Sequence, residues 1–331
     1  MKSLLTYLKD FKKAKIMVVG DIIADEFLVG KPERLSREAP VLILRRNNQK
    51  ILPGGAANAA YNISSLEGET HLVGVVGEDR SGKKLKTILV EKNINVSGIF
   101  SAKNRPTSLK TRVLAGGEQV VKQQIVRIDH LEQEDISKKL QDKIISHIKN
   151  NISEIDGLLL SDYGNGLFSS EMKKSLIKLG RKKGKFVAVD SRYDLLEFKG
   201  ASLATPNLEE AGNAVGKKLK TQNDVIKAGE KLIKSLKLDN LLITQGSDGM
   251  TLFSKNERHE HIPVANFSEV YDVTGAGDTV IGTLVLGLAA GVPISKAVRL
   301  ANYAAGIVVR KSGVAVVNPS ELKKEVIENE K

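Results

Sequence analysis

The chain of 331 residues contains no cysteine and no tryptophan. The absence of cysteine excludes disulfides, thiolate zinc sites, iron–sulfur clusters and cysteine nucleophiles. Aromatic residues make up only 4% of the sequence, so a function built on many aromatic stacking platforms is not expected. Hydrophobic residues still account for 41%, which is enough for the core of one large α/β domain.

Long uninterrupted hydrophobic runs are also missing. The apolar stretch near the start of the chain is broken by Lys9, Asp10, Lys12 and Lys13, so no secretory signal is predicted. The longest later run, residues 280–292, is too short and too rich in glycine to span a bilayer. The sequence therefore predicts a soluble, cytoplasmic protein with no membrane partner.

The formal net charge is +12. A basic balance is typical of nucleic-acid binding, but here the lysines are spread along the whole chain beside apolar positions with helical spacing. This spread favours solvated helix faces, and no helix concentrates arginine with aromatic residues. We expect no nucleic-acid partner, with a basic nucleic-acid-binding protein as the non-enzymatic alternative. The positive field would favour anionic small substrates.

Short β-branched or aliphatic runs alternate with amphipathic stretches along the chain. The runs expected to be buried parallel strands are residues 15–21, 70–77, 157–162, 185–190, 201–207 and 240–246. The stretches expected to be helices are residues 140–152, 171–184, 224–237 and 279–291. This alternation predicts an α/β fold, a doubly wound and mostly parallel sheet with helices on both faces. Ligands then bind at the carboxyl ends of the strands.

Two segments, residues 26–52 and 105–130, show no helical period. VLILRR (41–46) and KTRVLA (110–115) favour strands, and Lys31-Pro32 and Gly116-Gly117 are turn signals. We expect these segments to form a small antiparallel sheet that projects from the main domain.

The most informative motif is DVTGAGDTVIG (272–282), a glycine-rich turn that leads into an apolar helix. Gly275, Ala276 and Gly277 would present backbone N–H groups at the helix start, which is an anion site by geometry and dipole. Asp278 follows at once. A lone aspartate there would be an N-cap contributing about 1 kcal/mol. A donor turn beside a carboxylate is instead what phosphoryl transfer to a hydroxyl requires.

Two further motifs each allow two interpretations. In PGGAANAA (53–60), Gly54 and Gly55 would let the backbone approach a ligand, and Asn58 offers a donor and an acceptor to hydroxyls. The same residues also suit a glycine turn before an alanine-rich helix. Asp21 lies past the carboxyl end of a predicted strand, where a ligand would bind, but an Asx-turn or N-cap would equally place it there.

Polar residues follow two later strands. Asn207 and Glu210 can support magnesium and phosphates, or simply form a capping box. Thr244, Gly246 and Gly249 end the next strand, where they would face a nucleotide.

Together these motifs resemble the ribokinase-like (PfkB) carbohydrate kinases. GGAANAA (54–60) resembles the first family signature and DVTGAGDTVIG (272–282) the second, with GEDRSG (77–82), NLEE (207–210) and TQGSDG (244–249) between them in the family's order. The resemblance extends over about residues 14–320. It implies one kinase domain over residues 1–331, use of ATP and Mg²⁺, and a β-lid formed by residues 26–52 and 105–130. We also expect a homodimer formed through this lid.

The resemblance implies a role for each matched residue. Asp278 would be the catalytic base, with Gly275, Ala276 and Gly277 as the anion hole. The residues implied to bind sugar hydroxyls are Asp21, Gly54, Gly55 and Asn58. The residues implied to lie near magnesium and ATP are Asn207, Glu210, Thr244, Gly246 and Gly249. A potassium-type cation is implied beside the anion hole, at Asp272, Thr274 and backbone carbonyls near 305–313.

Within the family, the chain most resembles the D-glycero-D-manno-heptose-7-phosphate kinases of lipopolysaccharide synthesis. The segments that carry this resemblance are residues 20–41, 53–66, 110–115, 123–129, 158–166 and 269–282. It implies phosphorylation of the anomeric hydroxyl of heptose 7-phosphate, as in ADP-heptose synthesis. The chain has no His-x-Gly-His adenylyltransferase signature, so a kinase-only form is expected.

Basic residues of the predicted lid favour a phosphorylated acceptor. Lys110 and Arg112 are two positions apart and share one face of a strand, and Arg127 follows in the same segment. An acceptor phosphate needs such cations. They also suit an exposed, charged sheet edge that prevents aggregation.

Two other enzyme functions remain open on the sequence. A PfkB-type kinase of another acceptor, such as a hexose, fructose phosphate, ribose or a nucleoside, fits the same motifs. GEDRSGKK (77–84) nearly matches the P-loop of NTPases, but Lys84 has no hydroxyl for magnesium, and Glu78 and Asp79 would meet the phosphates.

Overall fold

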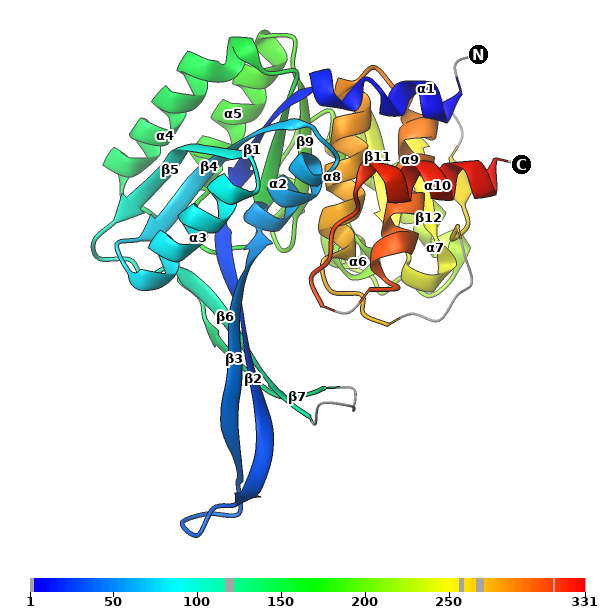
Figure 1. The fold of residues 1–331 in the computed structure, drawn as a ribbon. Helices are drawn as coiled ribbons and strands as arrows, with labels where there is room; N and C mark the ends of the chain where they lie inside the picture. Colours follow the sequence, from blue (N-terminus) through cyan, green and yellow to red (C-terminus); the bar gives the residue numbers. More distant parts are fainter. Residues whose placement is uncertain (1–2, 117–121, 256–258, 266–270, 312, 331) are drawn as a thin grey trace.

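The protein folds around a nine-stranded sheet, sheet A (Figure 1). The computed structural model describes residues 3–116, 122–255, 259–265, 271–311 and 313–330. In spatial order, the strands of sheet A are β13 (Glu260–Ile262), β12 (Met250–Ser254), β11 (Asn240–Thr244), β10 (Leu203–Ala204), β9 (Phe186–Ser191), β8 (Gly157–Asp162), β1 (Lys15–Gly20), β4 (Glu69–Gly77) and β5 (Ile94–Ala102). Within sheet A, as far as the structure describes it, only the pairings of β12 with its two neighbours are antiparallel.

Helices cover both faces of sheet A (Figure 1). The helices on one face are α1 (Leu4–Leu8), α2 (Ala56–Ser65), α3 (Arg80–Glu91), α8 (Ala276–Ala289), α9 (Ile294–Val308) and α10 (Pro319–Asn329). The helices on the other face are α4 (Lys138–Asn151), α5 (Ser170–Lys182), α6 (Leu208–Val215) and α7 (Gln222–Ser235). The strands between them are buried on both sides, which explains their nearly continuous apolar runs. Along β1, Ile16 packs into one core and Met17 into the other.

The predicted fold class is confirmed by this arrangement. Each of the six runs expected to be parallel strands overlaps one of the strands β1, β4, β8, β9, β10 and β11, with ends that agree within two residues except at β10, where the run 201–207 is longer than the strand. The four expected helices coincide with α4, α5, α7 and α8. Among the described helices, none combines the length and the apolar character needed to cross a bilayer.

A second sheet, sheet B, projects from the body as a long twisted ribbon (Figure 1). Its strands, in spatial order, are β3 (Leu42–Gly55), β2 (Ile22–Leu35), β6 (Ser108–Ala115) and β7 (Gln123–His130). We expected an antiparallel sheet, but β2 and β6 pair in parallel. The chain passes through α2, β4, α3 and β5 of the body between β3 and β6, and this crossover lets β6 run alongside β2 in the same direction.

The turn expected at Lys31-Pro32 is wrong. Both residues lie inside β2, where the pairing with β3 shifts register between Pro32 and Arg34. A proline is tolerated at such a bulge because no ladder hydrogen bond is required from it. The chain instead reverses after Leu35, where the N–H of Ser36 donates to the carbonyl of Val41 at 2.8 Å. Gly116 follows β6 directly, and Gly117 lies outside the described residues.

Candidate active site

The turn that precedes α8 places Asp278 at the base of a cleft. Gly275 adopts a φ of 81°, and a Cβ at this position would lie 2.8 Å from the side-chain nitrogen of Asn58. Only glycine therefore lets the chain turn this closely above α2. Asp278 follows in the first turn of α8 and is buried.

Two side chains from distant segments hold the Asp278 carboxylate. The Nδ2 of Asn58 donates to Oδ2 at 2.7 Å, and the Oη of Tyr163 donates to Oδ1 at 2.9 Å. Asn58 is itself fixed, because the amide of Asn62 donates to its backbone carbonyl at 2.9 Å. Thr279 in turn donates to the Oδ1 of Asn62 at 2.7 Å. The carboxylate thus has a defined orientation before any substrate binds.

The surroundings of Asp278 tune its acidity. Burial raises its pKa to about 6, although the hydrogen bonds from Asn58 and Tyr163 oppose this rise. The nearby Asp25 carboxylate raises the pKa further, and the Lys110 ammonium lowers it. The group is therefore ionised at neutral pH but more basic than an ordinary aspartate, as suits a general base. Below about pH 6 it becomes protonated and can no longer accept a proton.

The backbone at the start of α8 offers hydrogen-bond donors. Among the described residues, the N–H groups of Gly277 and Asp278 have no protein acceptor. The N–H of Ala276, which was predicted to belong to the anion hole, instead donates to the carbonyl of Val273 at 3.2 Å. The donors left for a ligand thus include those at Gly277 and Asp278, at the positive end of the helix dipole.

A cavity of about 630 Å³ opens in front of these donors. Its lining includes Gly275, Gly277 and Asp278, together with three residues predicted to lie near the nucleotide, namely Asn207, Glu210 and Thr244. The predicted Gly246 and Gly249 are not among its described lining residues. Gly249 instead shapes the turn between β11 and β12, where a Cβ would lie 2.2 Å from the carbonyl of Ile262.

Of the two interpretations that the sequence allowed for Asn207 and Glu210, the capping box is present in the structure. They form a capping box for α6, in which the Oδ1 of Asn207 accepts the N–H of Glu210 at 2.9 Å. They also line the cavity, where burial raises the pKa of Glu210. The pKa of Asp190 is raised well above its ordinary value, first by burial and then by the charge of Glu210.

The side-chain oxygen atoms of Asn207, Glu210 and Asp190 suit a hard divalent cation that is bound to the phosphates of a nucleotide. Among the described residues, no group of three or more His, Asp or Glu side chains could by itself hold a metal ion. The ion would therefore depend on phosphate oxygens, with Asn207, Glu210 and Asp190 as support.

One face of sheet B turns charged groups toward Asp278. In the ladder between β2 and β6, Asp25 lies opposite Lys110, and Phe27 lies opposite Arg112. Arg112 forms a buried ion pair with Asp25 and packs 5.3 Å from the Phe27 ring centroid. The Lys110 ammonium lies 5.5 Å from the ring centroid of Tyr163, and burial lowers its pKa.

Asp25 and Tyr163 were not assigned site roles from the sequence. Asp25 lies within an apolar strand pattern, and its partner Arg112 is 87 residues away. Gly54 makes room for the Asp25 side chain, because a Cβ at position 54 would lie 2.5 Å from an Asp25 carboxylate oxygen. Tyr163 belongs to the segment LSDYGNG, which the resemblance singled out, but its bond to Asp278 spans 115 residues.

Gly55 lies apart from this charged group, whereas Arg127 lies directly opposite Arg112 in the β6–β7 ladder. Gly55 adopts a φ of 56°, and a Cβ there would lie 2.5 Å from the carbonyl oxygen of Asp21, so its role is to shape the backbone. Arg127 makes a two-pronged contact with Asp129, at 2.9 and 2.7 Å, and about half of its side chain is exposed.

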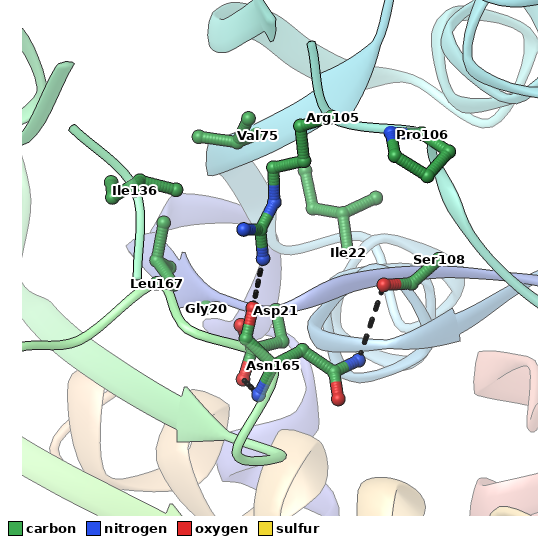
Figure 2. Close-up of a pocket in the computed structure, with 10 residues that line it drawn as sticks. All are labelled: Gly20, Asp21, Ile22, Val75, Arg105, Pro106, Ser108, Ile136, Asn165 and Leu167. Atoms are coloured by element: carbon green, nitrogen blue, oxygen red, sulfur yellow. Dashed lines mark hydrogen bonds between the residues drawn. The ribbon is translucent and has the colours of Figure 1, made fainter. Parts of the chain in front are cut away.

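Asp21, predicted to bind sugar, lies in a different cavity (Figure 2). Its Oδ2 accepts the backbone N–H groups of Tyr163 at 2.8 Å and Asn165 at 3.2 Å. The adjoining cavity measures about 10 Å³, the space of one water molecule.

The turn before α8 is tied to the chain after α9. Asp272 accepts the N–H of Thr274 at 2.9 Å through Oδ1 and that of Gly313 at 3.1 Å through Oδ2. Its own N–H donates to the carbonyl of Val309 at 3.2 Å. The structure thus brings the predicted cation-binding segments together.

In the segment that nearly matches a P-loop, residues 77–84, the Asp79 side chain hydrogen-bonds the backbone of the loop itself. Asp79 caps α3, accepting the N–H of Gly82 at 2.8 Å. It also accepts the N–H of Thr107 at 2.7 Å and its hydroxyl at 2.8 Å. A carboxylate therefore fills the position where a P-loop would bind phosphate.

Comparison with known proteins settles the family. The profile of the "pfkB family carbohydrate kinase" matches residues 13–321. The chain belongs to this family. Its members are phosphotransferases that act on sugars and use ATP and a divalent metal.

Curated relatives cover almost the whole of this pfkB-family chain. It is 40% identical over 317 residues to the bifunctional protein HldE of Proteus mirabilis, a match that covers 96% of the chain and 64% of the relative. It is 38% identical over 316 residues to the HldE of Geotalea uraniireducens, with 95% and 63% covered. The chain thus spans a little under two thirds of the length of these relatives.

Solved structures share the fold. Escherichia coli phosphofructokinase-2 in complex with potassium superposes with a TM-score of 0.77 at 19% identity, covering 96% of this chain and 99% of that one. Arabidopsis thaliana ribokinase complexed with ribose and ATP gives a TM-score of 0.73 at 21% identity, covering 95% and 98%.

Proposed function

We propose that this kinase transfers the γ-phosphoryl group of ATP to the anomeric hydroxyl of D-glycero-D-manno-heptose 7-phosphate. The product is the 1,7-bisphosphate, an intermediate of ADP-heptose and lipopolysaccharide core synthesis. The observation that carries the proposal is the buried Asp278 carboxylate, held by Asn58 and Tyr163 between the large cavity and the charged face of sheet B. The segments that resemble heptose 7-phosphate kinases and the HldE relatives support the choice of acceptor.

The geometry suits proton removal coupled to phosphoryl transfer. As the sugar hydroxyl oxygen forms its bond to the γ-phosphorus, the bond from that phosphorus to the leaving ADP oxygen breaks. The hydroxyl proton passes to Asp278, which is ionised above about pH 6. The free N–H groups at Gly277 and Asp278 stabilise the charge on the transferring group.

ATP would occupy the 630 Å³ cavity, with its phosphates at the start of α8. Asn207, Glu210 and Thr244 line the cavity and would contact the nucleotide and its metal. Mg²⁺, when bound, neutralises charge on the β- and γ-phosphates.

A monovalent cation such as K⁺ would bind between the Asp272–Thr274 turn and the backbone carbonyls after α9. Because this turn leads directly into the donor groups of α8, an ordered cation would hold them in place. We expect kcat to be higher in potassium than in tetramethylammonium at equal ionic strength. Equal rates in the two salts would count against the cation site.

The acceptor phosphate would be bound by Lys110 and Arg112. Among the described residues, Lys110 forms no ion pair, whereas Arg112 already pairs with Asp25 and would offer its remaining donors. Lys110→Met should lower kcat/KM for the sugar phosphate by about ten- to a hundred-fold, the value of one charge-assisted contact.

Steady-state kinetics with both substrates check this prediction. The KM for ATP should stay nearly unchanged, and Lys31→Met, at an exposed position of β2, should have no effect. Equal losses of kcat/KM for phosphorylated and unphosphorylated sugars would show that Lys110 does not bind the phosphate.

A homodimer formed through sheet B is supported by apolar side chains left exposed on it. The exposed fractions are 50% for Ile125, 58% for Ile128, 66% for Leu35 and 56% for Val41. Exposed apolar patches of this kind mark interaction surfaces. Sedimentation of the chain should give a dimer, and Ile125→Lys with Ile128→Lys should give a monomer. A monomeric parent chain would contradict the proposal.

An ATP-consumption screen tests the proposed acceptor. The acceptors compared are heptose 7-phosphate, free hexoses, fructose 6-phosphate, ribose and nucleosides. The highest kcat/KM is expected with heptose 7-phosphate. A preference for an unphosphorylated sugar would remove the heptose-phosphate assignment and leave the family assignment intact.

A further inference from the structure

Asp21 is a buried carboxylate that the phosphoryl-transfer step does not use. It lies at the carboxyl end of β1, and its N–H donates to the carbonyl of Ser161 at the end of β8. Burial raises its pKa to about 6, the charge of Asp162 adds to this rise, and three backbone N–H groups oppose it. A buried carboxylate is costly, so its contacts indicate what it stabilises.

The contacts of Asp21 reach both donors to the catalytic base. Its backbone carbonyl accepts the N–H of Ala56 at 3.0 Å, at the start of the helix that carries Asn58. Its side chain accepts the N–H of Tyr163 at 2.8 Å. Asn58 and Tyr163 are the two residues that hydrogen-bond Asp278.

Arg105 fixes the same turn from its other side (Figure 2). Its guanidinium donates to the carbonyls of Asn165 and Glu134, the latter at 2.5 Å. Arg105 lies just before β6, and Glu134 lies just after β7. The turn that carries Tyr163 is thereby connected to both ends of the β6–β7 hairpin of sheet B.

We propose that Asp21 is a positioning residue for the catalytic base, acting with Arg105 to hold the turn whose Tyr163 hydroxyl orients Asp278. This inference rests on the proposed role of Asp278 as the base. The Asp21 carboxylate acts through Tyr163, its backbone carbonyl holds the start of the helix that carries Asn58, and it does not touch the sugar.

A pH profile separates this role from general stabilisation. A hydrogen bond to an ionised carboxylate lowers its pKa, so a weaker Tyr163 contact should move the acid limb of kcat to higher pH. The other groups that face Asp278 are Asp25, Lys110 and, at longer range, Asp190. None of them is changed by a substitution at position 21.

The experiment compares Asp21→Asn, Tyr163→Phe and the double variant. Tyr163→Phe should move the acid limb upward by about one pH unit, the effect of one lost charge-assisted hydrogen bond. Asp21→Asn should move it in the same direction and lower kcat by about tenfold or more. The double variant should resemble Tyr163→Phe alone, because both changes remove the same contact.

If Asp21→Asn does not fold, Arg105→Met tests the same turn from its other contact. This variant should also move the acid limb of kcat to higher pH. Asp156→Asn is the matched control, because that carboxylate accepts the N–H of Lys15 at 2.8 Å at the opposite end of β1. Its profile should match the unsubstituted chain.

An acid limb that stays fixed in both Asp21→Asn and Arg105→Met overturns the proposal. So does a selective rise in the sugar KM with an unmoved limb, which would restore the sugar-binding role. Full activity in Asp278→Asn would instead remove the proposed base, and this inference with it.

Discussion

Asp278→Asn is expected to lower kcat by about 10²- to 10⁴-fold, the usual contribution of a general base. Asparagine keeps the size of the side chain and can still accept the hydrogen bond from Tyr163, but it cannot take the hydroxyl proton. ATP binding should remain nearly intact, because the backbone donors at the start of α8 are unchanged. Turnover and ATP affinity, measured separately, check the two parts of this prediction.

The pH profile sharpens the test of the base. In the unsubstituted chain, kcat/KM should fall about tenfold for each pH unit below about 6, because the pKa of Asp278 is raised to about 6. The variant should lose this limb. Asp142→Asn, at a surface position of α4, should retain both rate and limb. Retention of more than about a third of the turnover by Asp278→Asn would refute the assignment, because the expected loss is at least about 10²-fold.

Asp25→Asn is expected to lower kcat/KM for the sugar by about 10²-fold, with a smaller effect on the KM for ATP. The carboxylate faces the same region as Lys110 and Asp278, where it can accept a hydrogen bond from a sugar hydroxyl. The substitution also leaves Arg112 buried without its charged partner. Breaking a buried ion pair costs about 3–5 kcal/mol of stability, so unfolding must be measured alongside activity.

A double substitution separates binding from stability at this pair. Asp25→Leu with Arg112→Met replaces both charges by apolar groups and should recover much of the lost stability. Activity should not recover, because the acceptor for the sugar hydroxyl is still missing. Recovery of both properties together would show that Asp25 serves only to neutralise Arg112.

The sequence predicted the centre of the fold well, because strands buried on both faces have nearly continuous apolar runs. Strand β5, INVSGIFSA, alternates polar and apolar residues along much of its length, and six of its nine residues are at least partly exposed. Strands β12 and β13 are only five and three residues long. These three strands lie at or next to the edges of sheet A, and their weak or short patterns gave too little signal for prediction.

The candidate site was predicted in part for a similar reason. Asp278 and the glycines beside it form one local motif, whose turn geometry follows from the sequence alone. Asp25 and Tyr163 reach the site through contacts that span 87 and 115 residues. Asp21 was ambiguous in the sequence, because a strand-end aspartate suits both a ligand and a backbone turn, and only the fold shows its hydrogen bonds to the turn at Tyr163 and Asn165.

The central claim is that this chain phosphorylates the anomeric hydroxyl of heptose 7-phosphate. Phosphorus NMR of the chain incubated with ATP, Mg²⁺ and D-glycero-D-manno-heptose 7-phosphate tests it most directly. We predict a new signal from a phosphate coupled to the anomeric proton, appearing in step with ADP, while the 7-phosphate signal persists. No anomeric phosphate in that reaction, together with rapid phosphorylation of fructose 6-phosphate by the same preparation, would contradict the claim.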